Sequence, residues 1–265
     1  MNRTYGHDPI MSLVYIFAAT KWEARAVERI RSVTWTRGAE DQRTSGTTGR
    51  NCVRMFVTGV GPAAARAVAQ RMMAALGRRE LPLPDAFCVI GASGSLRARL
   101  PENAIVTYGA CLRERGAPPD GGSRTDCSLA LIQRAKAALD AEGIPCEIVA
   151  GITSPKVAAA RREKLRLAAY GADVVDMESY EILAAASEAG IARLAVRVIS
   201  DSLDRKIPDF TRAIRPAGDT DTLLATRIAL RAPISTLRMI VAQQRALARL
   251  SRAMEVVLAS HCFDA

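Results

Sequence analysis

The chain of 265 residues has only two histidines, His7 and His261, each close to one end. Ser-His-Asp triads, Cys-His pairs and multi-histidine metal centres all depend on a histidine held inside the fold, so this scarcity argues against each of them. Any proton moved at a site of this protein must then be carried by a carboxylate, a lysine, a tyrosine or a cysteine.

The chain also lacks the cysteine spacing of a zinc site or a redox centre. No CxxC pair occurs and no histidine is placed to complete a zinc site with the scattered cysteines, so the thiols are interpreted as reduced and mostly structural. We expect neither a metal nor a cofactor. The six cysteines are Cys52, Cys88, Cys111, Cys127, Cys146 and Cys262.

Aromatic residues make up only 5% of the chain, and no helix-turn-helix, zinc-finger or RNA-recognition pattern is present. The net charge of +10 comes from 37 lysines and arginines that are spread widely, so nucleic acid is not an expected partner. No apolar run reaches the ~18 residues of a membrane span, and the start MNRTYGHDPIMS lacks the pattern of a signal peptide. These absences predict a cytoplasmic protein.

What the sequence does contain is an alternation of β-prone apolar runs with segments of helical periodicity, which predicts an α/β fold. We expect a three-layer α/β/α domain with a mostly parallel central sheet over residues 1–218. The stretch RERGAPPDGGSRTD at 113–126 predicts a mobile surface loop. The expected strands are 13–19, 52–58, 85–96, 104–110, 145–154, 172–176 and 192–202, and the expected helices are 21–30, 62–76, 128–143, 157–171 and 180–190.

Residues 219–265 predict a helical extension of the same domain, basic and amphipathic. Two interpretations are open for its long helix, which covers residues 235–260. Either the helix packs in the core or between subunits, or it attaches to an anionic membrane surface. The apolar residues assigned to one side of it are Leu237, Ile240, Val241, Leu247, Leu250, Met254, Val257 and Leu258, and the arginines assigned to the other are Arg238, Arg245, Arg249 and Arg252.

Polar side chains follow several of the expected strands at the point where each strand ends. Glu23 follows the first, Gly-Ala-Ser at 91–93 the third, Asp176 and Glu178 a later one, and Ser200 with Asp201 the last. Taken singly, an acid in such a place is more often a helix cap or a solvated turn. Ligands of α/β folds, however, bind at the carboxyl ends of the strands, so together these residues indicate a site.

Four segments together resemble the nucleoside phosphorylase and nucleosidase superfamily over residues 13–215, most closely the branch with methylthioadenosine/S-adenosylhomocysteine nucleosidase. AATKWEA is similar to the strand and catalytic glutamate of the nucleosidases, TGVGPAAA to their Gly-x-Gly segment, and VIGASGSL to their glycine-rich loop. VVDMESYEI followed by VRVISDSLD is the most specific pair.

The resemblance implies a role for each matched residue. Glu178 would bind the ribose hydroxyls, with Met177 packed on the sugar. Asp201, held by Ser200, would protonate or hydrogen-bond N7 of a purine, and Glu23 would position and deprotonate a water. These roles suit cleavage of an N-glycosidic bond, in which the sugar becomes oxocarbenium-like as the base leaves. The remaining substrate-binding residues implied are Ala92, Ser93, Gly94 and Gly61.

The sequence departs from the superfamily pattern at three places. The strand AFCVIGAS has no arginine to grip phosphate, which favours water as the acceptor. Ala92 stands where the superfamily has Ser or Thr, so Ser93 is expected to supply that polar contact. The segment GITSPKVAAARREKL has no aromatic residue to stack on the base, so the substrate stays open.

With these departures, the sequence resembles one subgroup of the superfamily, the phosphorylase-like proteins associated with hopanoid biosynthesis. The resemblance implies release of adenine from adenosylhopane to leave ribosylhopane, by a homo-oligomer that contacts the inner face of the membrane through its C-terminal helix. The alternatives are a methylthioadenosine/S-adenosylhomocysteine nucleosidase, a purine nucleoside phosphorylase, and a nucleoside-binding module without catalytic activity.

Overall fold

The computed structural model describes residues 11–37, 44–115 and 123–264, so His7 lies outside the described residues. The strands are β1 (Ser12–Ala18), β2 (Thr34–Arg37), β3 (Thr44–Thr47), β4 (Asn51–Val57), β5 (Ala86–Ser95), β6 (Ile105–Arg113), β7 (Ser123–Asp126), β8 (Cys146–Thr153), β9 (Val174–Asp176) and β10 (Ala192–Asp201). The helices are α1 (Lys21–Glu28), α2 (Pro62–Gly77), α3 (Leu129–Ala141), α4 (Arg161–Ala168), α5 (Ser179–Glu188), α6 (Thr222–Arg231) and α7 (Pro233–Ala259), with a 3-10 turn η1 (Thr211–Ala213).

The predicted α/β fold is confirmed, with one correction to the sheet. The strand order is β10-β6-β8-β9-β5-β1-β4-β3-β2, β7 pairs with β6, and β10 also pairs with β5. The β5–β10 pairing closes β5, β10, β6, β8 and β9 into a ring. Of the pairings among described strands, five are parallel and five antiparallel, so the sheet is mixed rather than mostly parallel.

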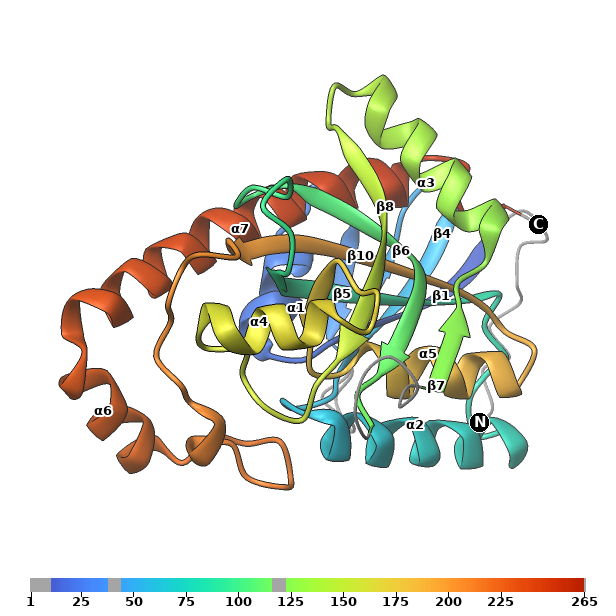
Figure 1. Cartoon of the computed structure of the whole chain (residues 1–265). Helices are drawn as coiled ribbons and strands as arrows, with labels where there is room; N and C mark the ends of the chain where they lie inside the picture. Colours follow the sequence, from blue (N-terminus) through green and yellow to red (C-terminus); the bar gives the residue numbers. More distant parts are fainter. Residues whose placement is uncertain (1–10, 38–43, 116–122, 265) are drawn as a thin grey trace.

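Helices cover the sheet on both sides (Figure 1), with α2 and α5 on one side and α1, α3 and the second half of α7 on the other. Strands that are covered on both faces read as near-continuous apolar runs, and this is why β1 and β5 were recognisable from sequence. At their centre Tyr15, Phe17, Phe56 and Phe87 pack against one another with ring centroids 4.7 to 5.9 Å apart.

Two stretches differ from the sequence-based expectation. Residues 31–51 were assigned no element, yet β2 and β3 form an antiparallel hairpin that extends the sheet beyond β4. The expected loop at 113–126 begins in β6 and ends in β7, which pair from Ala110 to Asp126, while residues 116–122 lie outside the described residues. Both were missed because the short strands TWTR, TSGT and SRTD carry polar residues and show little apolar alternation.

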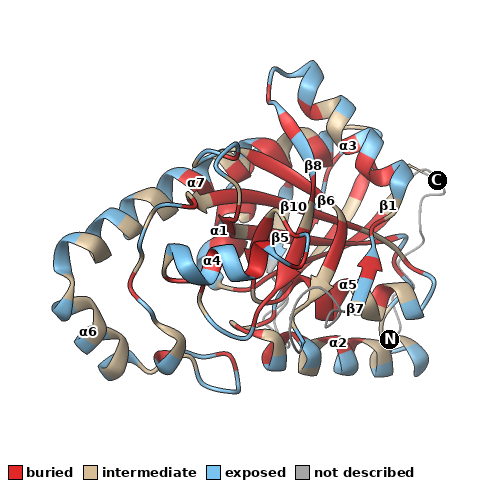
Figure 2. Cartoon of the chain, in the orientation of Figure 1, coloured by how far each residue is buried: buried red, intermediate tan, exposed pale blue. Residues whose placement is uncertain are grey.

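Helix α7 differs from a uniformly amphipathic helix because its two halves have different surroundings. From Ala246 onward it packs into the core, and Leu250, Met254 and Val257 are fully buried. Leu237, Ile240 and Val241, which were placed on the same side as these residues, are exposed. Figure 2 shows that α6 and the first half of α7 extend away from the sheet and carry no buried residue. We call residues 222–245 the α6–α7 arm.

Candidate active site

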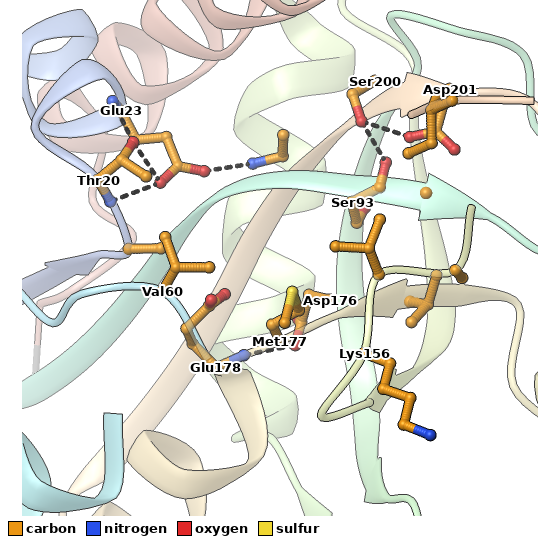
Figure 3. A pocket seen from close by; sticks show the side chains of 17 residues that line it. Thr20, Glu23, Val60, Ser93, Lys156, Asp176, Met177, Glu178, Ser200 and Asp201 are labelled. Atoms are coloured by element: carbon orange, nitrogen blue, oxygen red, sulfur yellow. Dashed lines mark hydrogen bonds between the residues drawn. The ribbon is translucent and has the colours of Figure 1, made fainter. Parts of the chain in front are cut away.

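The predicted site residues meet at a cavity of about 190 Å³ near the ends of β1, β5, β9 and β10. Figure 3 shows Glu23 on one side of this cavity and Asp201 with Ser200 on the other, with Met177 and Glu178 between them. Ala92, Ser93 and Gly94 also line it, whereas Gly61 does not, although its neighbour Val60 does.

Glu23 is held rigidly by both of its carboxylate oxygens. It occupies the third position of α1 and forms a capping box with Thr20, whose backbone N–H and hydroxyl donate to Oε2 at 2.9 and 3.0 Å. The backbone N–H of Ala92 donates to Oε1 at 2.9 Å. The helix-cap interpretation of this acid is therefore correct, and the same contacts fix its carboxylate in the cavity wall.

Glu178 lies at the start of α5 and points toward the start of α2. Gly61, the N-cap of α2, donates its backbone N–H to Oε1 of Glu178 at 2.8 Å. Burial, and then the nearby carboxylate of Asp176, raise the pKa of Glu178 to about 8. Gly61 thus acts on the site by holding Glu178, and the carboxyl of Glu178 takes up a proton near neutral pH.

Asp176, the other acid of the segment VVDMESYEI, holds the backbone around Glu178 in place. Its Oδ1 accepts the backbone N–H groups of Glu178 and Ser179, each at 3.1 Å, and the Thr153 hydroxyl at 2.8 Å. Its Oδ2 accepts the Tyr108 hydroxyl at 2.9 Å. With so many donors, Asp176 holds the start of α5 in place and thereby aims Glu178 into the cavity.

Asp201 is fixed by a serine and by a lysine that sequence reasoning missed. Ser200 Oγ donates to Oδ1 at 2.7 Å. The ammonium group of Lys164, in α4, forms an ion pair with Oδ2 and also donates to the backbone oxygens of Ser202 and Arg205. Lys164 is 0% exposed and Asp201 6%. In the sequence Lys164 belongs to the charged run RREK, which is typical of a solvated helix face, so no local signal set it apart.

Arg197 is a second residue that sequence reasoning missed. It lies in the middle of β10 and is 1% exposed, with Nη2 donating to Ser179 Oγ at 2.6 Å and Nη1 to the backbone oxygen of Ile90 at 3.0 Å. Nη2 also lies 3.2 Å from Asp176 Oδ2. Burial by itself would lower the pKa of Arg197, but Asp176 and the other acidic groups around it together raise the pKa above its ordinary value, so the guanidinium stays charged. An arginine inside the apolar run LAVRVIS was the available signal, because a buried charge needs a partner.

Gly91 allows Glu23 and Arg197 to approach the same point of β5. It has φ +144°, and a Cβ there would lie 2.4 Å from both Glu23 Oε1 and Arg197 Nη1. Three residues further along, a Cβ on Gly94 would lie 3.0 Å from Asp201 Oδ2. The glycines of VIGASGSL therefore let three charged side chains pack directly against the strand.

Ser93 presents an unused hydroxyl. The side chain is 3% exposed, and its Oγ has no hydrogen-bond partner among the described residues, although it lines the cavity. A buried polar atom is costly when it is left unpaired, so such an atom in a cavity wall indicates a contact that a ligand completes. That Ser93 supplies the polar contact in place of Ala92 stays a prediction.

Acidic side chains outnumber basic ones in the wall of the cavity. Asp176 and Asp201 each have a cation at short range, but Glu23 and Glu178 have no ion-pair partner within 4 Å in the described part of the chain. The one lysine among the lining residues, Lys156, lies at the edge with its ammonium directed away from the carboxylates (Figure 3). Such a wall stabilises positive charge that develops on a bound molecule and repels an anion.

Comparison with known proteins places this site in a family context. The sequence matches the model of the Phosphorylase superfamily over residues 14–231. The search of curated protein sequences finds no match to this chain.

Solved structures share the fold at low sequence identity. The native futalosine hydrolase of Helicobacter pylori strain 26695 has a TM-score of 0.70 at 13% identity, over 93% of this chain and 97% of that chain. The methylthioadenosine/S-adenosylhomocysteine nucleosidase of Neisseria meningitidis, in complex with methylthio-immucillin-A, has a TM-score of 0.69 at 14% identity, over 94% and 99%. The S-adenosylhomocysteine nucleosidase of Streptococcus pyogenes gives 0.69 at 14%, over 94% and 97%.

Proposed function

Because the chain belongs to the phosphorylase superfamily, whose model matches residues 14–231, we propose that it cleaves the N-glycosidic bond of an adenosine-type nucleoside with water as the acceptor. The observation that carries this proposal is the arrangement of three buried carboxylates, Glu23, Glu178 and Asp201, around one cavity. The sugar lies between them in the proposed complex, where Glu178 can accept hydrogen bonds from its hydroxyls and the carboxylates of Glu23 and Asp201 can stabilise its oxocarbenium character in the transition state.

Each residue has one task in this mechanism. Glu178 and Met177 face the sugar, and the carboxylate of Glu178 accepts hydrogen bonds from its hydroxyls. Glu23 lies across the cavity, where its fixed carboxylate orients a water and takes its proton as the bond to the base breaks. Asp201 and Ser93 face the base, which leaves with the electron pair of the glycosidic bond and takes up one proton from solvent, balancing the proton that Glu23 accepts from the water and later releases.

The Lys164–Asp201 ion pair supports a 6-aminopurine as the base. An ionised carboxylate only accepts hydrogen bonds, and adenine offers its amino group as a donor. A 6-oxopurine would direct a carbonyl oxygen at the same carboxylate, which is repulsive. The hydroxyl of Ser93 is free to donate to a ring nitrogen and to stabilise the negative charge that the leaving base acquires.

Water rather than phosphate is supported by charge. A phosphate acceptor would enter beside Glu23, which has no ion-pair partner within 4 Å among the described residues. Arg197 lies on the other side of Gly91 from Glu23, and its Nη1 and Nη2 groups are directed at Ile90, Ser179 and Asp176 rather than into the cavity. A multiply charged anion is therefore poorly accommodated, whereas a neutral water is not.

The substrate that we propose is adenosylhopane, an adenosine with a lipid on its 5′ carbon, and the products are adenine and ribosylhopane. No aromatic side chain is among the residues found to line the cavity, so recognition of the base relies on Asp201 and Ser93. Methylthioadenosine or S-adenosylhomocysteine is the second candidate, favoured by the likeness to solved nucleosidases over nearly the whole chain.

The test is release of adenine from adenosylhopane in detergent and from methylthioadenosine, each with and without inorganic phosphate, with identification of the sugar product. Adenine release from the lipid substrate that needs no phosphate and yields free ribosylhopane supports the proposal. A strict phosphate requirement would make the protein a phosphorylase. Tight binding of nucleoside without adenine release, with Asp201→Asn causing no change in rate, would make it a binding module.

A further inference from the structure

The α6–α7 arm exposes large apolar side chains in a part of the molecule that packs against little else. Helix α6 has no buried residue, and the first buried residue of α7 is Ala246. Leu223 is 79% exposed, and Leu230, Ile234 and Leu237 are each more than 60% exposed. A soluble protein rarely exposes so many aliphatic side chains within so short a segment unless they bind something.

The charge of the arm has one sign. No aspartate or glutamate occurs between Asp221 and Glu255. The arginines of the arm are all exposed, and none forms an ion pair within 4 Å among the described residues: Arg227, Arg231, Arg238 and Arg245. The arm is therefore apolar and strongly basic, with no acid of its own to balance it.

A groove of about 300 Å³ lies where the arm meets the body of the protein. Leu237 and Val241 contribute apolar walls from α7, and Arg238 and Arg245 flank them. Arg205 faces these residues from the loop after β10, where it forms an ion pair with Glu102. Two unpaired guanidinium groups beside aliphatic side chains match a ligand that is anionic at one end and apolar at the other.

We propose that the α6–α7 arm docks on the surface of an anionic lipid bilayer, with the groove receiving an acidic lipid headgroup. The aliphatic side chains insert at the level of the acyl chain ends while the arginines meet phosphate groups, as in other amphipathic helices that lie in the interface. This is peripheral binding, since within the described residues no helix is long and apolar enough to cross a membrane.

The charge and the apolar surface of the arm favour a bilayer over two other partners, a second copy of the chain and a nucleic acid. A second copy of the chain docked arm to arm would bring arginines against arginines, with no acidic residue from 222 to 254 to pair with them. Nucleic acid would satisfy the arginines but would leave Leu223, Leu230, Ile234 and Leu237 without an apolar partner. A bilayer of anionic lipids satisfies both features at once.

Docking at this place would bring the bilayer close to the active site. The backbone N–H of Val60, which lines the catalytic cavity, donates to the backbone oxygen of Gly218 at 2.9 Å, shortly before the arm begins. Arg205, which lines the groove, accepts a hydrogen bond from Lys164 through its backbone oxygen, and Lys164 pairs with Asp201. The inference goes beyond the proposed function, because it holds whatever group the nucleoside carries at its 5′ carbon.

Co-sedimentation of the full chain with vesicles tests the proposal without any activity measurement. We expect binding to vesicles of phosphatidylcholine mixed with phosphatidylglycerol and much weaker binding to phosphatidylcholine alone. Each arginine near the surface is worth about fivefold in affinity, so Arg238→Gln/Arg245→Gln should weaken binding roughly 25-fold. Leu237→Gln should weaken it on both kinds of vesicle, because it removes the inserted side chain.

A charge-matched control separates the arm from the overall charge of the protein. Arg31→Gln/Arg71→Gln removes two exposed arginines outside the arm and should change binding less than about threefold, since at moderate salt only charges within about 10 Å of the surface contribute. Circular dichroism checks that each variant is folded. Equal binding to both kinds of vesicle, or an equal loss in the control, would overturn the proposal. So would binding of an oligonucleotide duplex in place of vesicles, or dimerisation that Leu237→Gln abolishes.

Discussion

The Lys164–Asp201 ion pair gives the sharpest prediction about how the active site is built. Lys164 is 0% exposed and Asp201 6%, so replacement of either residue leaves the other as a buried charge without its partner. Breaking a buried pair in this way costs about 3–5 kcal/mol. Lys164→Met and Asp201→Asn should each lower the free energy of unfolding by about that amount, because the charge that remains is desolvated and uncompensated.

The double variant Lys164→Met/Asp201→Asn provides the decisive comparison, since it removes both charges together. Its loss should be smaller than the sum of the two single losses by about 1–3 kcal/mol, which is the coupling expected of residues in contact. The assay is urea unfolding at pH 7, with thermal unfolding as a second measure. For a chain of this length, 3–5 kcal/mol corresponds to a fall of about 6–20 °C in Tm.

Adenine release by variants of Lys164 tests whether the ion pair orients Asp201 for catalysis. Lys164→Arg keeps a cation and should retain more adenine release than Lys164→Met, in which Asp201 loses the group that orients it. The reasoning is refuted if both single variants lose less than about 1 kcal/mol, or if the losses add without coupling. Either result would mean that the two side chains do not form a buried pair.

Three further predictions concern the remaining site residues. Burial raises the pKa of Glu178 to about 8, so the folded protein keeps a proton that the unfolded chain releases above about pH 4.5. The free energy of unfolding, measured with urea, should therefore fall as the pH rises from about 4.5 to about 8. Glu178→Gln should remove that pH dependence. Gly91→Ala places a Cβ 2.4 Å from Glu23 Oε1 and Arg197 Nη1 and should lower kcat about 100-fold or more. The control Gly77→Ala, with no atom within 4 Å of its Cβ, should leave kcat unchanged. Equal kinetics in the two variants would contradict the geometry. Glu23→Gln should lower kcat about 10²–10⁴-fold with nucleoside affinity retained, measured by adenine release and calorimetry; a kcat near that of the unmodified protein would remove Glu23 from the mechanism.

Much of the candidate site could be predicted from the sequence, because its carboxylates follow strands that are easy to recognise. Buried strands read as continuous apolar runs, and the ends of neighbouring strands converge, so Glu23, Glu178 and Asp201 could be expected at one place. Their roles on substrate stay predictions until the variants are measured. The charged partners of these residues were not predicted, because nothing local distinguishes a buried lysine in RREK from a solvated one.

The exposed apolar surface is another feature that only the tertiary structure decided. In the sequence, Leu237 and Val241 look equivalent to Leu250 and Met254, since all four fit the periodicity of one long helix. Their difference arises because α7 reaches the sheet only from Ala246 onward. Periodicity describes the side chains of a helix, but it cannot say where along its length a neighbour is present.

The sequence by itself determined the buried strands, most of the helices and which carboxylates follow those strands, since these features follow from apolar periodicity and from helix caps. The tertiary structure alone decided that β10 pairs with β5 and closes the ring, that Lys164 and Arg197 reach the site from α4 and β10, and that Gly91 must lack a side chain. These features depend on contacts between residues far apart in the chain. Such contacts are set by packing and by the pairing of buried charges, which leave no periodic mark on the sequence.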